Sequence, residues 1–159
     1  MTQQGKTIVR RYFTEVLNNG NYDLIKDLFS PSFIFSGPST KRPVSGMPER
    51  IYDFVATLRR AFPDLFVSIE NSIAEENQVV VIWRMTGTHE RAFRRIKPTH
   101  RHCSITGMDI FTIENGRIEG MWAFFEMQSL LEQIPVKSLP APKKKNVRTT
   151  AAAKKRKAH

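Results

Sequence analysis

The chain has 159 residues, a formal net charge of +10 and 40% apolar residues, which fits one domain with one hydrophobic core and excludes a fully disordered chain. No stretch approaches the roughly 18 consecutive apolar residues of a membrane helix, and no apolar run follows a basic start, so we expect neither a membrane-spanning nor a secreted protein. The single cysteine, Cys103, excludes an internal disulfide and a cysteine-rich zinc site, and it favours a reducing, cytoplasmic compartment.

Three helices are predicted in the N-terminal part of the chain, because apolar residues recur there at helical spacing. Asn and Gly residues at 18–21 end the first helix, since both accept the left-handed conformation found at helix C-termini. Pro31 and Pro63 stop the second and the third. A short strand over 32–35 and a loop rich in turn residues separate the second helix from the third. The three helices cover residues 7–17, 22–29 and 47–62.

From Leu65 onward the apolar period changes to two, which predicts β-strands. Within these strands, Trp83 and Met85 fall on one face. Asn115-Gly116 between two such runs is the strongest short signal for a hairpin turn. This order predicts an α+β fold, in which the three helices pack on one face of a curved antiparallel sheet. The strands run from 65 to a polar turn at 75–77, then over 79–88, 104–113 and 117–126, and a short helix over 129–134 follows.

A two-residue turn at Asn115-Gly116 also predicts the register of the last two strands, with Glu114 facing Arg117. In that register both faces of the hairpin are largely apolar, and the helices can cover only one of them. We therefore expect a homodimer, in which a second copy covers the other face. One face would carry Asp109 and Phe111 with Trp122 and Phe124, and the dimer face would carry Met108, Ile110, Met121 and Phe125.

Two carboxylates of this hairpin are candidates for chemistry. Asp109 lies in mid-strand among apolar or small neighbours, and a buried Asp is rare unless it is paired or functional. It is either a hydrogen-bonded structural carboxylate or a proton-transfer group on a pocket floor, with its pKa raised by desolvation. Glu126 lies on the same predicted face, roughly 14 Å along the strand from the position opposite Asp109. It either lines the same cavity or is solvated at the strand end.

Other motifs for chemistry are weak. His89, His100 and His102 do not have the spacing of a zinc site, so we expect no metal. Cys103 has no partners for a nucleophilic triad and is expected to be an ordinary buried thiol. Glycines are scattered at turns, without the glycine-rich loop of a nucleotide-binding enzyme, and we expect no cofactor.

Several short segments over about residues 8–134 follow one family pattern in order. They are Tyr12–Asn18, Gly20–Phe29, Ala61–Leu65, Arg84–His89, Ile96–Thr99, Thr106–Phe111, Glu114–Ile118 and Trp122. In this order they resemble the SnoaL-like ester cyclase (polyketide cyclase) family. The resemblance implies the NTF2-like cone fold, usually dimeric, with a deep apolar pocket. It also implies cofactor-free, aldol-type ring closure of a polyketide ester, driven by an acid–base carboxylate.

The chain departs from that family pattern at two places. Phe35-Ser36 stand where members often carry an Asp-His pair. The last strand reads Gly-Met-Trp-Ala over 120–123, where members often have Glu-Glu-Trp-Asp. The resemblance therefore places the family's catalytic aspartate on Ala123, or on Glu126 if the later carboxylate is its counterpart.

Two function hypotheses follow. The first is a cofactor-free cyclase, hydratase or isomerase that acts on an apolar, carbonyl-bearing small molecule, with Glu126 or Asp109 as the catalytic base. The alternative is a non-catalytic NTF2-like module that binds a ligand or a partner. The residues expected to contact the substrate are Trp122, Phe124, Phe111, Trp83, His89 and Tyr12.

The strongly basic balance comes from the C-terminal end. Residues 1–136, the predicted domain, hold 16 basic and 15 acidic residues, whereas residues 137–159 hold 9 basic residues and no acid. The low-complexity end is predicted to be a disordered tail. Three roles are open for this tail: a solubilising end, a polyanion-binding arm or a nuclear-import signal. If it is an import signal, the expected location is nuclear and not cytoplasmic. The residues that would contact a polyanion are Lys143, Lys144, Lys145, Lys154, Lys155, Arg156 and Lys157.

Overall fold

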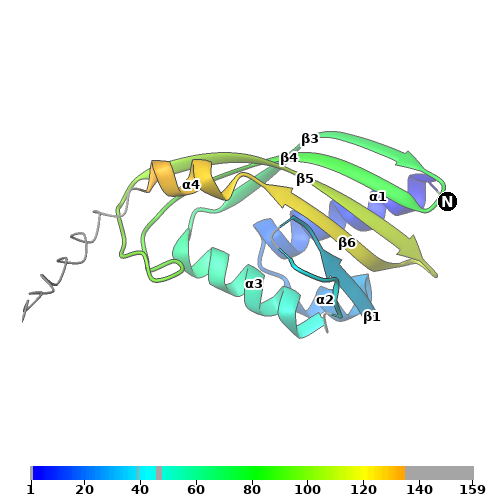
Figure 1. Cartoon of the computed structure of the whole chain (residues 1–159). Coiled ribbons are helices and arrows are strands. Elements are labelled where there is room, and N and C mark those ends of the chain that lie inside the picture. Colours follow the sequence, from blue (N-terminus) through cyan, green and yellow to red (C-terminus); the bar gives the residue numbers. More distant parts are fainter. Residues whose placement is uncertain (1, 39, 46–47, 135–159) are drawn as a thin grey trace, which may run out of the picture.

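A computed structural model describes residues 2–38, 40–45 and 48–134 (Figure 1). A curved six-stranded sheet forms one layer, and α1, α2 and α3 lie on one of its faces, which confirms the predicted α+β class. The helices are α1 (Thr2–Arg11), the π-helix η1 (Tyr12–Asn18), the 3-10 turn η2 (Tyr22–Leu24), α2 (Ile25–Leu28), α3 (Pro48–Ala61) and α4 (Met127–Gln133). The strands are β1 (Phe29–Ser36), β2 (Val44–Ser45), β3 (Phe66–Glu75), β4 (Gln78–Thr88), β5 (His102–Glu114) and β6 (Arg117–Phe125).

The helices agree with the predicted segments in place but differ in detail. The first begins at Thr2 and changes into a π-helix at Tyr12, where no Pro or Gly predicts such a change. The second is only a 3-10 turn and one α-helical turn, because Phe29 already enters β1. The third, α3, agrees best, since its long apolar period is ended by Pro63.

The sheet has the strand order β2-β1-β6-β5-β4-β3. Neighbouring strands are antiparallel, as predicted, except β1 and β6, which are parallel. A parallel pair needs a long crossover. Here α3, β3, β4 and β5 intervene between the two strands, and this distance along the chain hides their pairing from local sequence patterns.

The register of the final hairpin is as predicted only next to its turn. Glu114 faces Arg117 and Ile113 faces Ile118, but Thr112 then faces Gly120, so Glu119 is an extra residue in β6. Such a β-bulge moves every later side chain to the opposite face of the strand. The predicted faces of β6 are therefore wrong: Met121, Ala123 and Phe125 lie on the helix-covered face, and Trp122 and Phe124 lie on the outer face.

Aromatic side chains build the core under this inner face. Tyr12 contacts Phe13, Phe29 and Phe111 edge to face, with ring centroids 5.2–6.0 Å apart. Trp83 and Met85 point inward from β4, as their alternation predicts. These contacts hold η1 against the sheet and so position the residues of the site.

The described part of the chain ends before the basic segment. The predicted tail at 137–159, with its polyanion-binding lysines, lies outside the described residues and stays a prediction. None of the described helices is long and apolar enough to cross a membrane.

Candidate active site

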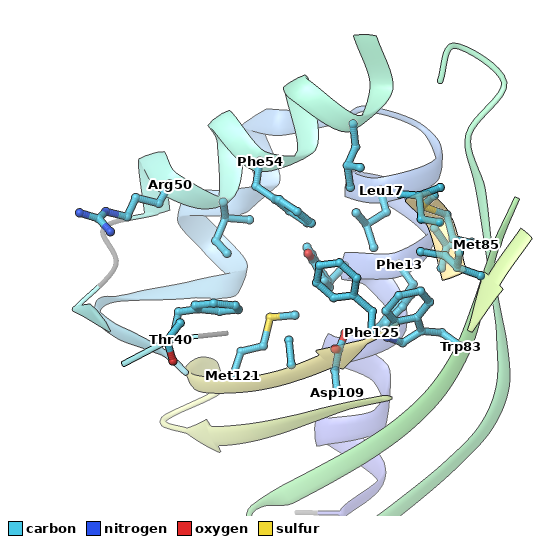
Figure 2. Close-up of a pocket in the computed structure, with 18 of the residues that line it drawn as sticks. Phe13, Leu17, Thr40, Arg50, Phe54, Trp83, Met85, Asp109, Met121 and Phe125 are labelled. Atoms are coloured by element: carbon cyan, nitrogen blue, oxygen red, sulfur yellow. The ribbon is translucent and has the colours of Figure 1, made fainter. Parts of the chain in front are cut away.

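A cavity of about 360 Å³ lies between the inner face of the sheet, η1 and α3 (Figure 2). Its wall is mostly apolar, as expected for a small-molecule site. The lining side chains that carry polar atoms are Tyr12, Thr40, Arg50, Trp83, Arg94 and Asp109. Apolar lining residues include Phe13, Leu17, Phe54, Met85, Met121, Ala123 and Phe125.

The π-helical segment η1 forms one wall of this cavity. In a π-helix residues five apart bond along the backbone, so Tyr12 and Leu17 lie on the same side, and both line the cavity. Short π-helical stretches occur often at functional sites. This segment therefore presents an aromatic and an aliphatic side chain to the same space.

Asp109 is the one acidic residue among the described residues that line the cavity, and Figure 2 shows it beside Trp83 and Phe125. It lies in the middle of β5, with Val81 of β4 and Ala123 of β6 as its cross-strand neighbours. Only 4% of its surface is exposed. Burial raises the pKa of Asp109 to about 8, because the apolar surroundings disfavour the charged form.

Trp83 reaches Asp109 because Gly107 leaves space for its indole ring. Trp83 of β4 and Gly107 of β5 face each other, and a Cβ at Gly107 would lie 2.1 Å from Cζ2 of Trp83. The nearby indole N–H lowers the pKa of Asp109 by less than burial raises it. Among the described residues, neither Nε1 of Trp83 nor Oδ1 of Asp109 has a hydrogen-bond partner. These two buried polar atoms thus lie close together in the wall without a hydrogen bond of good geometry.

Tyr12 adds a hydroxyl group to the same cavity. Burial raises its pKa far above the ordinary value, and the ionised form of Asp109 raises it further. The phenol therefore stays neutral at physiological pH. It is a neutral hydrogen-bond donor in the cavity wall.

The rim of the cavity carries positive charge. Arg94 lines it from a two-residue turn, in which the backbone N–H groups of Phe93 and Ile96 each donate to the other residue's carbonyl oxygen, at 3.0 and 2.8 Å. Arg94 and Arg95 have φ angles of 45° and 69°, and this left-handed conformation costs a non-glycine residue about 1 kcal/mol or more. The Arg94 guanidinium lies over the Phe93 ring, 5.7 Å from its centroid.

The structure brings three of the predicted site residues together: Tyr12, Trp83 and Asp109 all line the cavity. Trp122 and Phe124 do not line it, because the bulge at Glu119 turns them to the outer face of the sheet. Their predicted place in the pocket is wrong for this reason.

Three other predicted site residues lie near the cavity without lining it. Phe111 is on the inner face but is covered by the rings of Tyr12 and Phe13. His89 is buried against Phe62, with ring centroids 5.3 Å apart. Glu126 is exposed just before α4. Their predicted contact with a ligand in this cavity is not supported by these positions.

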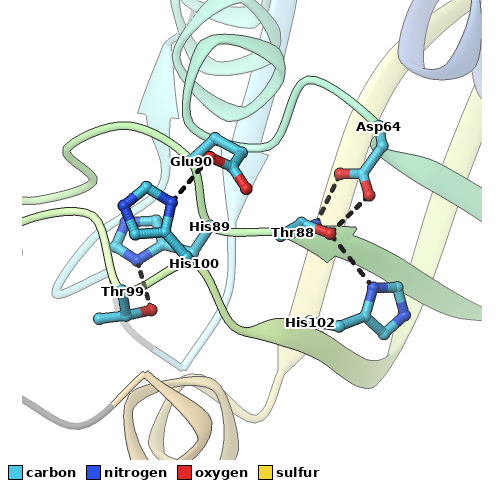
Figure 3. A network of polar contacts seen from close by, with 7 residues as sticks. All are labelled: Asp64, Thr88, His89, Glu90, Thr99, His100 and His102. Carbon is cyan, nitrogen blue, oxygen red and sulfur yellow. Dashed lines mark hydrogen bonds and ion pairs between the residues drawn. The ribbon is translucent and has the colours of Figure 1, made fainter.

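Figure 3 shows that His89 belongs to a network of polar contacts near the ends of β4 and β5. Its Nδ1 lies 3.1 Å from Oγ1 of Thr99, and burial lowers the pKa of His89. Asp64 accepts hydrogen bonds from the backbone N–H and the hydroxyl of Thr88, at 2.6 and 2.7 Å. In the part of the chain that the structure describes, no three His, Cys, Asp or Glu residues gather to hold a metal ion.

Several lining residues were not predicted from the sequence. Met121 and Phe125 were missed because of the bulge, and Gly120 beside it was the available signal, since glycine inside a strand often marks a bulge. The same bulge turns Ala123, which the resemblance placed at the catalytic position, toward the cavity. Arg94 was missed because it lies between the predicted strands over 79–88 and 104–113, where no helix or strand was predicted.

Known proteins share this sequence pattern and this fold. A family model for SnoaL-like polyketide cyclases matches residues 7–134. Comparison with curated proteins finds no match. A protein from Jannaschia sp. CCS1, assigned as a SnoaL-like polyketide cyclase, is 27% identical, with a TM-score of 0.76 over 84% of this chain and 92% of that chain.

Two further solved structures are alike in fold. AclR from Streptomyces galilaeus, assigned as a hydroxylase, is 21% identical, with a TM-score of 0.74 over 84% of this chain and 97% of that chain. IdmH from Streptomyces antibioticus, assigned as a polyketide cyclase, is 20% identical, with a TM-score of 0.71 over 84% and 99%. These likenesses confirm the NTF2-like fold. The different assigned activities also show why function has to be inferred from the site.

Proposed function

Because the chain belongs to the SnoaL-like polyketide cyclase family, we propose that it carries out cofactor-free acid–base chemistry next to a carbonyl group of a mostly apolar molecule bound in the cavity. Asp109 is the acid–base residue. The observation that carries the proposal is its carboxyl group, which is buried in an apolar wall, has an oxygen without a partner among the described residues, and has a pKa of about 8. Such a group exchanges protons effectively near neutral pH.

The position of Asp109 also fits the family pattern. The resemblance places the family's catalytic aspartate on Ala123, which directly faces Asp109 across β5 and β6. Side chains that face each other on neighbouring strands have Cβ atoms about 4.5–5.5 Å apart. The carboxyl group of Asp109 is thus one strand away from the family position and serves the same cavity.

In the proposed reaction, the Asp109 carboxylate removes a proton from the carbon next to the carbonyl. The negative charge moves to the carbonyl oxygen, where the hydroxyl of Tyr12 is the neutral donor. The resulting carbanion forms a carbon–carbon bond to a second carbonyl of the same molecule, and the protonated Asp109 returns its proton to the new alkoxide. Atoms and charges balance without a cofactor.

The test is proton exchange, which does not require the natural substrate. Exchange of the protons between the two carbonyls of ethyl benzoylacetate in D₂O, followed by NMR, measures the base directly. Asp109→Asn keeps the shape and removes the base, so the protein-dependent rate should fall by roughly 10²–10⁴. Binding of the ester should persist.

Two variants serve as controls for this test. Asp64→Asn removes a carboxylate outside the cavity, and Glu126→Gln removes the other candidate base; both should keep the parent rate. A parent rate in Asp109→Asn would exclude Asp109 as the base, and a parent protein that does not accelerate exchange would favour the non-catalytic ligand-binding module. Loss of exchange in Glu126→Gln alone would transfer the role to Glu126.

The proposed setting is cytoplasmic, which the lone and buried thiol of Cys103 supports. The proposed partners are the carbonyl-bearing ligand, a second copy of the chain across the outer face of the sheet, and a polyanion for the basic segment at 137–159.

A further inference from the structure

We propose that Arg94 binds an anionic group of the ligand at the rim of the cavity. The ligand is then an amphipathic molecule, with an apolar body inside the cavity and a carboxylate or phosphate at its mouth. This inference rests on the proposed function only for the carbonyl group near Asp109. The recognition of the anion by Arg94 stands on observations of its own.

The first observation is where the cations of the cavity lie. In the part of the chain that the structure describes, the basic residues that line it are Arg50 and Arg94. The guanidinium of Arg50 points away from the cavity, and only its stem faces the rim (Figure 2). The guanidinium of Arg94 is instead held over the ring of Phe93, which itself lines the cavity and is buried. Arg94 is therefore the better placed of the two for a charged part of a ligand.

The second observation is the backbone that presents Arg94. Both central residues of its turn have positive φ angles, a conformation that Asn and Gly adopt with much less strain than Arg. The turn is also firmly attached, because the N–H groups of Glu90 and Arg91 bond the carbonyl of Ala61, and the N–H of His89 bonds that of Arg101. A strained residue held by ordered surroundings is a recurrent feature of binding sites.

The third observation is the lack of a counter-ion. Within residues 2–38, 40–45 and 48–134, Arg94 has neither an ion pair nor a hydrogen-bond partner for its side chain. Its neighbours in the loop are also exposed cations: Arg91, Arg95, Lys97 and Arg101. The one acidic residue of the loop over 89–101, Glu90, is paired with His100 at 2.8 Å. A positive rim beside an apolar cavity is complementary to a molecule with one anionic end.

The experiment compares probes that share one apolar body. N-phenylnaphthylamine, which is neutral and fluoresces in apolar surroundings, reports occupancy of the cavity. It is displaced by methyl naphthoate, naphthoate or naphthyl phosphate, so that the neutral, carboxylate and phosphate forms are compared on the same ring. The proteins are the full chain and its Arg94→Gln, Arg95→Gln and Arg50→Gln variants. Arg95→Gln is the matched control, because it removes the same charge from the same turn without altering the cavity wall.

In the parent, one or both anionic probes should displace the dye at lower concentration than methyl naphthoate. Arg94→Gln should weaken the preferred anion by about tenfold, the effect of one charge-assisted hydrogen bond at a partly exposed site, and leave methyl naphthoate within about twofold. Arg95→Gln and Arg50→Gln should keep the preference. The stronger of the two anions identifies the group as carboxylate or phosphate.

Three outcomes would overturn the inference: no preference for either anion in the parent, equal losses in Arg94→Gln and Arg95→Gln, or a loss in Arg50→Gln alone. The readout is binding, so it is independent of proton exchange. Asp109→Asn is expected to keep the preference for anions. If exchange is unaffected in that variant, the proposed function fails while the result for Arg94 still decides this inference.

Discussion

Asp109 couples the chemistry of the site to the stability of the protein. In the unfolded chain its carboxyl group ionises near pH 4, whereas in the folded protein it keeps its proton up to about pH 8. Between these values the folded state binds more protons than the unfolded state, so the free energy of unfolding decreases as the pH rises. Above about pH 8 both states are ionised and this contribution becomes constant.

Asp109→Asn should therefore be more stable than the parent at about pH 9 and similar to it at about pH 4, as measured by urea unfolding. Asp64→Asn is the control of opposite sign. Hydrogen bonds from Thr88 lower the pKa of Asp64, so its carboxylate stabilises the fold above its unfolded pKa, and the variant should lose a little stability at both neutral and basic pH. If the free energy of unfolding had the same pH dependence in the parent and in Asp109→Asn, the carboxyl group of Asp109 would not be buried as described.

The pair of positions 109 and 123 allows the base to be moved. Ala123 faces Asp109 across the hairpin and lines the same cavity. In an Asp109→Asn background, Ala123→Asp should recover part of the proton-exchange rate, because it restores one carboxyl group to the same wall. Ala123→Asn in that background is the matched control and should recover none. Equal rates for the two would show that the cavity does not use a carboxylate from this wall.

Within β5, Gly107 decides how Trp83 lies over the strand. A Cβ at this position would meet three atoms of the indole ring at 2.1–2.6 Å, so Gly107→Ala must displace the ring toward the cavity. Such overpacking costs about 1–3 kcal/mol. The measurement is the midpoint of urea unfolding, together with binding of N-phenylnaphthylamine, which should weaken.

Gly120 in β6 offers the matched control for Gly107. Its added Cβ would lie 3.5 Å from Thr112, an ordinary contact, so Gly120→Ala should change stability by less than about 0.5 kcal/mol. Equal effects at the two glycines would contradict the close approach of Trp83 to β5.

The outer face of the sheet predicts how two chains associate. The dimer face predicted from the sequence is partly wrong, because the bulge turns two of its residues, Met121 and Phe125, into the cavity. The apolar residues that share the outer face are Ile82, Met108, Ile110, Trp122 and Phe124, which neighbour one another across β4, β5 and β6. We propose a homodimer through this face, since a contiguous apolar surface of this kind is rarely left in water.

Phe124→Glu should convert this dimer into a monomer, because it would bury an unpaired charge at the interface. Tyr52→Glu is the control: Tyr52 on α3 is 46% exposed, as is Phe124, but lies in the helical layer. Light scattering at low micromolar concentration should show a dimer for the parent and for Tyr52→Glu. A monomeric parent would exclude the proposal.

Local patterns in the sequence were enough to predict the fold class and the positions of the long strands and of α3. The apolar period of α3, the Asn-Gly turn and the alternation that points Trp83 inward each depend on residues a few positions apart. The buried Asp109 was also predicted, because a carboxylate among apolar strand residues stands out in any register. These features depend on helix and strand propensity and on the polarity of single positions, both of which can be read from residues close in the sequence.

The identity of the cavity wall depended on contacts between distant segments. One extra residue at Glu119 exchanges the faces of β6, and Glu119 is held by a hydrogen bond from Ser32 of β1, 2.6 Å long, on a strand far away in the sequence. The position of Arg94 likewise depends on bonds from its loop to the end of α3. Strand register and loop placement are set by backbone pairing across the whole sheet, where a shift of one residue changes which side chains meet, and only the tertiary structure decides that shift.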